Sequence, residues 1–473
     1  MRKISLRGVC GNPDNGSESM KSSRKPRQVF ILVVDIGIFF LALFLALLVR
    51  YGALPSLAEW WILCKSFVLS WVLWIVLYYT IDLYNLDIAF DEPRFAGRLF
   101  GAVAGGALVS ALIFYLDISS RTPKTILAIY AAFLYALLWI WRFAYSRFSR
   151  LYLPRRSTAF VGVDETVAEI VDAIESHLHL GYEAAVFLDE TGTAPAGFRH
   201  PTCKDRNEFI RAVEERDVSL IVVADESRLS EETRRALFDL IDKPVRFMHL
   251  PEFYELFLRR IPIGTINDLW FLENIDLRAK RKYEIFKRGF DIILSLALIL
   301  VSMVVLLVTA LAIKLSSHGP IFFRQVRLGR GGRTFDILKF RTMRTDGNDF
   351  APTGANDPRI TAVGNFLRKS RLDEIPQMIN ILAGEMSFVG PRPERPELAV
   401  DLERSIPYYR QRLLVTPGVT GWDQVSGEYH SPSIGDTYKK LQYDLYYVKN
   451  MSITLDMSIF LKTIKTVFRH KGR

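Results

Sequence analysis

Five apolar runs, each about long enough to cross a lipid bilayer, constrain this chain more than any other feature of its sequence. Four lie close together, at residues 29–49, 60–81, 98–117 and 124–141, and the fifth covers residues 286–313. A helix of about 20 apolar residues spans the roughly 30 Å hydrocarbon core of a bilayer. Hydrophobic residues make up 50% of the 473 residues, which is high for a soluble protein. We therefore expect a multidomain membrane protein with soluble parts.

Positively charged residues predict how the first four runs are oriented. Residues 1–28 are basic next to the first run, the loop of residues 51–59 carries no Lys or Arg, and five arginines lie within residues 142–156. Because Lys and Arg concentrate on the cytoplasmic side of membrane proteins, we expect both ends of this region to be cytoplasmic. Residues 1–28 are then a cytoplasmic tail, and residues 29–150 form a four-helix transmembrane bundle.

Two features of the predicted bundle concern contacts between its helices. Gly97, Gly101 and Gly105 make two overlapping GxxxG patterns, which permit close helix packing. We favour packing within the bundle, with contact between two protomers of a homodimer as the alternative. Asp35 lies inside the first apolar run, where an acid marks a functional site by default. We predict a structural partner within the bundle instead, because no pathway of charged residues accompanies it.

Residues 151–250 have the pattern of a small α/β domain. Strand patterns alternate with helix patterns, which predicts a parallel, Rossmann-like sheet. The strands are expected at residues 158–163, 184–188, 218–224 and 245–250. The turn after the first strand begins with Gly162 but lacks the later glycines of a dinucleotide site, and Asp164 and Glu165 lie where a pyrophosphate would bind. We therefore expect no nicotinamide cofactor, and a degenerate regulatory or packing domain.

The fifth apolar run opens a third domain, residues 284–473, after a linker at residues 251–283. Basic residues flank residues 286–313 on both sides. An ordinary crossing would require one basic flank to be translocated. We therefore predict a re-entrant helix that enters and leaves on the cytoplasmic side, with its bend near Ser302. An ordinary fifth span is the alternative.

Two adjacent acids, Asp373 and Glu374, are the strongest candidates for chemistry in this third domain. They lie in residues 361–382, where apolar residues recur at the spacing of one amphipathic helix. Adjacent helical residues lie about 100° apart, so the two acids can serve one pocket in different roles. Lys339 and Arg341 share one face of an extended segment. Taken alone, the pair also fits a solvated helix face with ordinary charge pairs.

The formal net charge of +10 fits contact with anionic lipid or with phosphorylated substrates. Nucleic acid would also explain it, but many of the Lys and Arg residues flank apolar runs, so we expect no nucleic-acid partner. The three cysteines, Cys10, Cys64 and Cys203, are too scattered for a metal site or a disulfide framework.

Several motifs of the third domain, taken in their order and spacing, resemble the bacterial sugar transferase family. They are KRGFD at 287–291, GPIFFRQ at 319–325, KFRTM at 339–343, RLDEIPQ at 371–377, MSFVGPRP at 386–393, PGVTGW at 417–422 and YDLYYVKNMS at 443–452. Members of this family are monotopic polyprenyl-phosphate glycosyl-1-phosphate transferases with an α-rich catalytic domain and a re-entrant membrane helix. The preceding bundle and α/β domain resemble the large form that starts exopolysaccharide, capsule or O-antigen assembly.

The resemblance implies transfer of a sugar 1-phosphate from a UDP-sugar, usually a hexose, to undecaprenyl phosphate, with release of UMP. It implies that Asp373 is the nucleophile that forms a covalent phosphosugar intermediate, and that Glu374 holds Mg²⁺. The predicted phosphate-binding residues are Lys339, Arg341, Arg368 and Arg392. The chemistry agrees, because a carboxylate that attacks a phosphoanhydride needs a metal ion and guanidinium groups to offset the charge.

One departure from the family pattern concerns the re-entrant helix. The family usually has a Ser-Pro pair in its middle, whereas this chain has Ser302-Met303 and no proline in the run. Without proline, the bend must come from Ser302 bonding to a carbonyl or from tertiary contacts. The expected location is the bacterial inner membrane, with the catalytic domain on the cytoplasmic face.

Two other functions stay open at this stage. One is a non-catalytic membrane scaffold for polysaccharide assembly, which the joint presence of Asp373, Glu374 and the basic residues disfavours. The other is a nicotinamide-dependent sugar-modifying enzyme, which the broken glycine turn disfavours. The sequence does not identify the sugar, and glucose, galactose and N-acetylated sugars all remain candidates.

Overall fold

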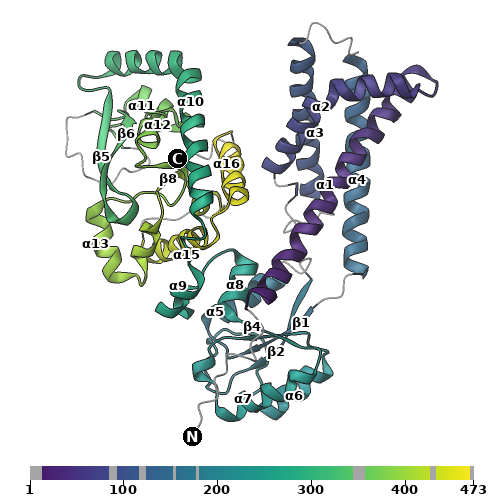
Figure 1. Ribbon diagram of the computed structural model, residues 1–473, viewed down its shortest axis with the longest axis vertical. Coiled ribbons are helices and arrows are strands. Elements are labelled where there is room, and N and C mark those ends of the chain that lie inside the picture. The colour runs from purple at the N-terminus through teal and green to yellow at the C-terminus, as the bar shows by residue number, and fades with distance from the viewer. Residues whose placement is uncertain are drawn as a thin grey trace. The chain divides into compact units, whose positions relative to one another are not determined.

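The computed structural model describes residues 13–81, 83–84, 93–116, 124–152, 156–176, 181–344, 357–426 and 433–468. The chain divides into two compact units, Met1–Leu258 and Arg259–Arg473. The first unit contains a helical bundle and an α/β domain, and the second contains the fifth apolar run and the Asp-Glu pair (Figure 1).

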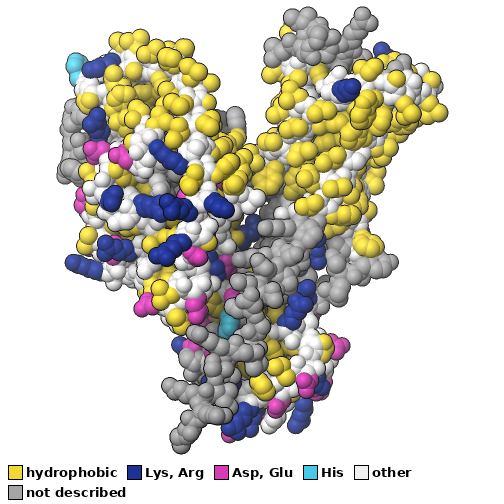
Figure 2. Space-filling model, viewed as in Figure 1, with side chains coloured by type: hydrophobic (Ala, Val, Ile, Leu, Met, Phe, Trp, Pro, Cys, Tyr) yellow, Lys and Arg dark blue, Asp and Glu magenta, His cyan; other side chains and the backbone are white. Residues whose placement is uncertain are grey.

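Four long helices form the bundle. They are α1 (Pro13–Tyr51), α2 (Leu57–Thr80), α3 (Pro93–Leu116) and α4 (Lys124–Tyr152). Each contains a stretch long and apolar enough to cross a membrane, as does α10 in the second unit. Large aromatic side chains such as Phe39, Trp74 and Tyr130 fill the bundle core, while the outward surface is also apolar, with Leu108 and Leu112 exposed (Figure 2). Helices that are apolar on all sides suit a lipid environment, so the prediction of a membrane protein is confirmed.

The acid inside the first apolar run has a partner in the bundle. Asp35 is fully buried, and Arg142 Nη2 of α4 donates a hydrogen bond to its Oδ2 at 2.7 Å. Arg142 Nη1 also donates to the Leu83 carbonyl at 3.1 Å. A buried charge needs such a partner to remain ionised, so the prediction of a structural partner for Asp35 is confirmed.

The two GxxxG patterns of α3 lie in two different environments. A Cβ atom added at Gly97 or Gly101 would meet no described atom within 4 Å, whereas one at Gly105 would lie 3.6 Å from Leu77. At the neighbouring Gly106, a Cβ would come within 2.7 Å of the Trp74 ring. Packing within the bundle is therefore confirmed for Gly105 and wrong for Gly97 and Gly101, which leave their part of α3 open in the described structure.

The α/β domain has a four-stranded parallel sheet with strand order β2-β1-β3-β4. Its elements are β1 (Arg156–Val161), α5 (Glu165–Ser176), β2 (Tyr182–Leu188), α6 (Arg206–Glu215), β3 (Leu220–Val223), η3 (Glu226–Arg228), α7 (Glu231–Phe238), η4 (Asp239–Asp242), β4 (Arg246–His249) and α8 (Leu250–Leu258). One apolar core lies between the sheet and α5 and α8, and a second lies between the sheet and α6 and α7. The predicted parallel α/β architecture is confirmed. The predicted linker, residues 251–283, contains most of α8, which packs in this domain.

The second unit joins one long apolar helix to a domain of short elements. They are η5 (Ile263–Thr265), α9 (Asp268–Asn274), α10 (Arg281–Ser316), β5 (Phe322–Leu328), η6 (Arg330–Gly332), β6 (Thr334–Phe340), α11 (Ala362–Ser370), η7 (Leu372–Glu374), α12 (Gln377–Ala383), β7 (Ser387–Val389), α13 (Pro396–Ser405), η8 (Tyr409–Leu414), β8 (Gly418–Thr420), α14 (Trp422–Val425), α15 (Ile434–Asn450) and α16 (Ile453–Phe468). The sequence pattern of two strand-like stretches, residues 321–327 and 334–340, around a glycine-rich turn predicts a β-hairpin, and this prediction is confirmed, because β5 and β6 pair antiparallel. The strands β7 and β8 form a short parallel pair.

Both ends of α10 are attached to this same domain. Near its start, Arg288 Nη2 donates to the Leu382 carbonyl of α12 at 2.7 Å. Just past its end, Arg341 Nη2 donates to the Ser317 carbonyl at 2.7 Å. A straight helix of 36 residues would be about 54 Å long, which would carry its far end well away from the start.

The ribbon of α10 changes direction part-way along its length (Figure 1). Ser302 Oγ donates to the Leu298 carbonyl, one turn earlier, at 2.5 Å. A serine that bonds to the carbonyl four residues before it favours helix bending. This contact is the one predicted for a bend without proline.

Candidate active site

The two acids lie in a break between two helices, so the prediction of one continuous helix over residues 361–382 is wrong. The helix α11 ends at Ser370 because Arg371 adopts a left-handed conformation, with φ 55° and ψ 19°. Leu372–Glu374 then form the short 3-10 helix η7, and α12 starts after Pro376. Few non-glycine residues adopt a positive φ, and those that do cluster at functional sites. The break turns the acids into the domain instead of leaving them on a helix surface.

Glu374 lies at the centre of three basic side chains. Its Oε1 accepts hydrogen bonds from Lys339 Nζ at 2.8 Å and from Arg392 Nη2 at 3.1 Å, and its Oε2 lies 3.8 Å from Arg371 Nη1. Burial alone would raise the pKa of Glu374, but the three cations together hold that pKa well below its ordinary value. Glu374 is therefore ionised throughout the neutral range.

Asp373 has a different environment from its neighbour. Burial raises the pKa of the Asp373 carboxyl, and the charge of Glu374 raises it further, while Lys339 and Arg368 offset only part of the effect. Lys339 and Arg368 act on Asp373 through their charge, and among the described residues no side chain donates a hydrogen bond to this carboxylate. When two adjacent acids have pKa values pushed apart by their environments, they suit different chemical roles.

Arg368 precedes the acid pair in the sequence and Arg392 follows it, and each acts mainly on a different acid. Arg368 lies in the last turn of α11, and its Nε donates to Thr342 Oγ1 at 2.9 Å. Its positive charge acts on Asp373, whereas Arg392, in the segment between β7 and α13, binds Glu374 directly. Guanidinium groups placed in this way are well suited to phosphate oxygens.

Arg341 is not placed with the other three predicted phosphate-binding residues. Its guanidinium donates to the carbonyls of Ser317 and His318, and its side chain is buried. The strand β6 ends at Phe340, so the alternation that would put Arg341 on the same face as Lys339 does not continue. The structure gives Arg341 a role in attaching the end of α10.

Arg371 is the residue of this site that the sequence interpretation did not assign. It flanks the acids in the RLDEIPQ motif, its Nη1 lies 3.8 Å from Glu374 Oε2, and its own backbone is left-handed. Its position two residues before Asp373 was the available signal. The conformation that selects Arg371 was not readable from residue type.

The acids fit a metal ion that also binds substrate phosphates. The described residues contain no group of three or more His, Cys, Asp or Glu side chains that could hold a metal on its own. Mg²⁺ commonly takes one or two carboxylates and completes its shell with phosphate oxygens and water. Glu374 Oε1 is engaged by Lys339 and Arg392, whereas among the described residues its Oε2 has only the longer contact to Arg371. One oxygen of Glu374 is thus less engaged, next to Asp373.

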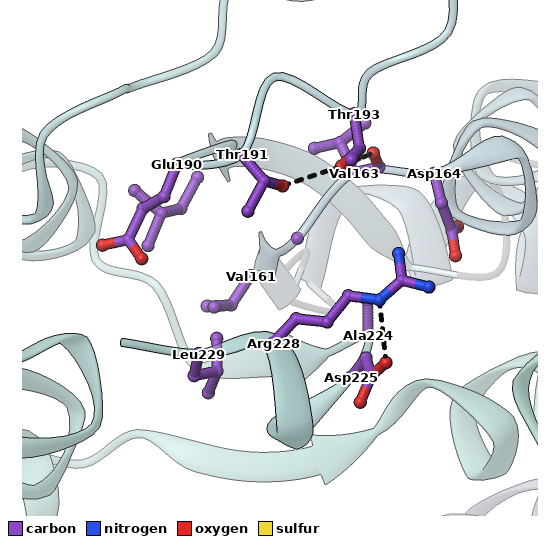
Figure 3. Close-up of a pocket in the computed structure, with 12 residues that line it drawn as sticks. Val161, Val163, Asp164, Glu190, Thr191, Thr193, Ala224, Asp225, Arg228 and Leu229 are labelled. Carbon is purple, nitrogen blue, oxygen red and sulfur yellow. Dashed lines mark hydrogen bonds and ion pairs between the residues drawn. The ribbon is translucent and has the colours of Figure 1, made fainter. Parts of the chain in front are cut away.

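A crevice lies at the carboxyl ends of β1, β2 and β3 in the α/β domain (Figure 3). This edge, where the strand order reverses, is the usual ligand site of such folds. Here Asp164 Oδ1 accepts a hydrogen bond from the Val167 N–H at 2.8 Å, so a carboxylate of the chain itself caps α5. The one basic side chain of the lining, Arg228, pairs with Asp225 at 3.1 Å (Figure 3). These charges do not favour a pyrophosphate, and the absence of a nicotinamide cofactor stays a prediction.

Comparison with known proteins defines the class of this site. Residues 282–470 match the family described as bacterial sugar transferase, and residues 79–251 match the family described as CoA-binding domain. Over 322 residues the chain is 30% identical to the UDP-glucose:undecaprenyl-phosphate glucose-1-phosphate transferase of Escherichia coli (strain K12), covering 67% of this chain and 69% of that protein. The chain therefore belongs to the bacterial sugar transferase family and is an enzyme.

Other relatives carry different sugars in their names. The UDP-N-acetylgalactosamine-undecaprenyl-phosphate N-acetylgalactosaminephosphotransferase of Aeromonas hydrophila is 43% identical over 194 residues, covering 40% of this chain and 45% of that protein. The UDP-galactose-lipid carrier transferase of Erwinia amylovora is 31% identical over 357 residues, covering 68% of this chain and 70% of that protein. Similarity to these proteins therefore does not select one sugar.

Proposed function

We propose that this enzyme transfers a sugar 1-phosphate from a UDP-sugar to undecaprenyl phosphate, releasing UMP, as the first step of an exopolysaccharide, capsule or O-antigen pathway. The observation that carries the proposal is the arrangement of Asp373 and Glu374 among Lys339, Arg368 and Arg392. It lies within the residues that match the sugar transferase family. Relatives named for undecaprenyl phosphate support the choice of acceptor.

The reaction has two displacements at one phosphorus atom. In the first, an Asp373 carboxylate oxygen attacks the sugar-linked phosphorus of the UDP-sugar. The bond from this phosphorus to the bridging oxygen breaks, and UMP leaves with the electron pair. In the second, a phosphate oxygen of undecaprenyl phosphate attacks the same phosphorus and frees Asp373. The raised pKa of Asp373 supports this role, because a more basic carboxylate is a better nucleophile while it remains ionised.

The basic side chains offset the charge of the diphosphate. Lys339 and Arg392 now bind Glu374, and the same donors are placed to bind anionic phosphate oxygens beside it. Mg²⁺, held by Glu374 together with the substrate phosphates, would supply further positive charge at the diphosphate. Stabilisation of developing charge by prearranged donors is usually the largest contribution to such catalysis.

The anchoring of α10 supports a site on the cytoplasmic face of the inner membrane. Both ends of α10 are held by Arg288 and Arg341 to the domain that carries the acids. Ser302 bonds to a carbonyl where the helix would bend. We infer that α10 enters and leaves through the cytoplasmic leaflet, because UDP-sugars are cytoplasmic and the lipid phosphate lies at the surface of that leaflet.

The test is UMP release from a panel of UDP-sugars by membranes that contain undecaprenyl phosphate. Asp373→Asn should abolish release and the covalent phosphosugar adduct, which intact-protein mass spectrometry detects in the wild-type enzyme. Asp401→Asn, on the exposed surface of α13, is the matched control and should retain both. Normal UMP release by Asp373→Asn would refute the assignment of Asp373 as the nucleophile. Absence of UMP release by the wild-type enzyme from every UDP-sugar would favour a non-catalytic scaffold.

A further inference from the structure

The segment that carries Arg392 is held by an unusual set of hydrogen bonds. Each of its four successive carbonyls accepts from a different donor outside the segment. The donors are the Gly418 N–H to Pro391 at 3.0 Å, Arg412 Nη2 to Arg392 at 2.9 Å, Arg327 Nη1 to Pro393 at 3.1 Å and the Leu328 N–H to Glu394 at 2.9 Å. Two of the four donors are arginine side chains.

The sequence of this segment explains why it needs external donors. Pro391 and Pro393 have no N–H group, so the segment cannot form regular backbone hydrogen bonds of its own. Proline also restrains the residue before it to extended conformations. The direction of the Arg392 side chain therefore depends on the groups that bind the surrounding carbonyls.

Arg412 is the most deeply placed of these donors. It lies in η8, and its side chain is 3% exposed. Besides the Arg392 carbonyl, its Nη2 contacts Asp444 Oδ2 of α15 at 2.7 Å, and its Nη1 donates to Tyr409 Oη at 2.9 Å. Burying an arginine and an aspartate has a large desolvation cost, and apolar residues of similar size often give equal stability. Stability alone therefore does not explain an ion pair here.

The geometry points to Arg412 as a positioning residue that, with Asp444, directs Arg392 toward the substrate phosphates. Arg412 binds the carbonyl of Arg392, and the guanidinium of Arg392 lies 3.1 Å from Glu374 Oε1. Loss of the Arg412 contact frees the Arg392 peptide to rotate, which moves its side chain away from the acids. This inference rests on the proposed function, since it requires that Arg392 bind phosphate.

A double-mutant cycle on UMP release tests the inference. Arg412→Met combined with Asp444→Leu removes both charges of the ion pair, and the partly buried Glu394, whose Oε1 also lies 3.8 Å from Arg412 Nη1, keeps Lys440 as its partner. This paired variant should lower kcat/KM for the UDP-sugar by about tenfold or more, since small misplacements of binding groups have effects of this size. In an Arg392→Ala background the same pair of changes should have little further effect, because the residue that it positions is gone.

The control is a second buried ion pair of the same unit. Lys287 Nζ lies 2.5 Å from Asp456 Oδ2, and in the described structure the other hydrogen-bond partners of the Asp456 carboxylate are Tyr283 and Tyr447, outside residues 391–394. Lys287→Met combined with Asp456→Leu should change kcat/KM by the same factor with and without Arg392. Arg412→Lys provides a variant that keeps the charge next to Asp444 but lacks the planar guanidinium fork, whose two terminal nitrogens reach the Arg392 carbonyl, Asp444 and Tyr409. It should fold normally and still lose activity.

The outcomes separate the inference from the function beneath it. Arg412 does not position Arg392 if Arg392→Ala is impaired while the paired variant keeps the wild-type kcat/KM. The same conclusion follows if Arg412→Met combined with Asp444→Leu lowers kcat/KM by the same factor in the wild-type and the Arg392→Ala backgrounds. Absence of UMP release from the wild-type enzyme would instead remove the proposed function, and the inference with it. Wild-type activity of Arg392→Ala would overturn the phosphate role of Arg392 and hence any reason to position it.

Discussion

Gly364 in the first turn of α11 offers a test in which the structure and helix propensity predict opposite results. On propensity alone, Gly→Ala in a helix stabilises a protein by up to about 1 kcal/mol. At Gly364, however, an added Cβ would lie 1.9 Å from the Thr342 carbonyl oxygen, which is backbone and cannot rotate away. Gly435 in the first turn of α15 is the matched control, because a Cβ there would meet no described atom within 4 Å.

The size of the clash sets the expected loss. Ordinary van der Waals contact requires the Thr342 carbonyl to retreat by about 1.5 Å, which breaks its hydrogen bond from the Thr361 N–H. Overpacking that moves backbone destabilises by about 1–3 kcal/mol, and this case lies at the upper end. For a unit of this size, about 3 kcal/mol corresponds to a fall in Tm of about 6–12 °C.

The assay is thermal unfolding of the full chain in detergent, followed by the protease resistance of the fragment that carries residues 259–473. Gly435→Ala should unfold at or slightly above the wild-type temperature. Gly364→Ala should unfold well below it, and it should also lose activity because Thr342 holds Arg368 near Asp373. Equal Tm values for the two variants would refute the packing of α11 on the segment after β6.

Three further outcomes are expected. Glu374→Gln should raise the Mg²⁺ requirement of UMP release or abolish activity, and an unchanged Mg²⁺ titration would contradict its role as a metal ligand. Asp35→Asn should lower the stability of the bundle by about 3 kcal/mol, measured by thermal unfolding in detergent, because it leaves Arg142 buried without its counter-charge. Burial beside Asp444 raises the pKa of Asp423 to about 7, above its value in the unfolded chain. Between about pH 4, where an aspartate titrates in the unfolded chain, and pH 7, the folded chain binds more protons than the unfolded one. Stability should therefore fall as pH rises across this window and level off above pH 7, and Asp423→Asn should flatten the slope in unfolding measured at several pH values within it.

Elements defined by local patterns could be predicted from the sequence. The apolar runs that became α1 to α4 were recognisable because the length of a membrane helix is set by the bilayer. The parallel sheet was recognisable because buried strands alternate with amphipathic helices such as α5. The hairpin β5-β6 had a glycine-rich turn between two strand patterns. Each of these signals is contained within a short stretch of chain.

Features that depend on contacts between distant residues could not be predicted in this way. Lys339 and Glu374 are 35 positions apart, and their 2.8 Å contact exists only because β6 lies beside η7. The contacts of Arg341 were equally hidden, since its place in the KFRTM motif suggested a site residue and gave no sign that its guanidinium attaches the end of α10. Gly97 and Gly101 fit a packing motif, yet the bundle leaves them open in the described structure.

The acid pair shows how two different local structures can both direct neighbouring side chains into different environments. The continuous-helix interpretation separated Asp373 from Glu374 by about 100°, and a 3-10 helix such as η7 separates neighbours by about 120°. Adjacent side chains therefore diverge in either structure. What distinguishes the two acids is the set of partners that each direction reaches: Glu374 meets Lys339 and Arg392, whereas Asp373 is buried with its charge only partly offset. The left-handed conformation of Arg371 ends α11 just before the acids, so that both acid side chains point into the domain.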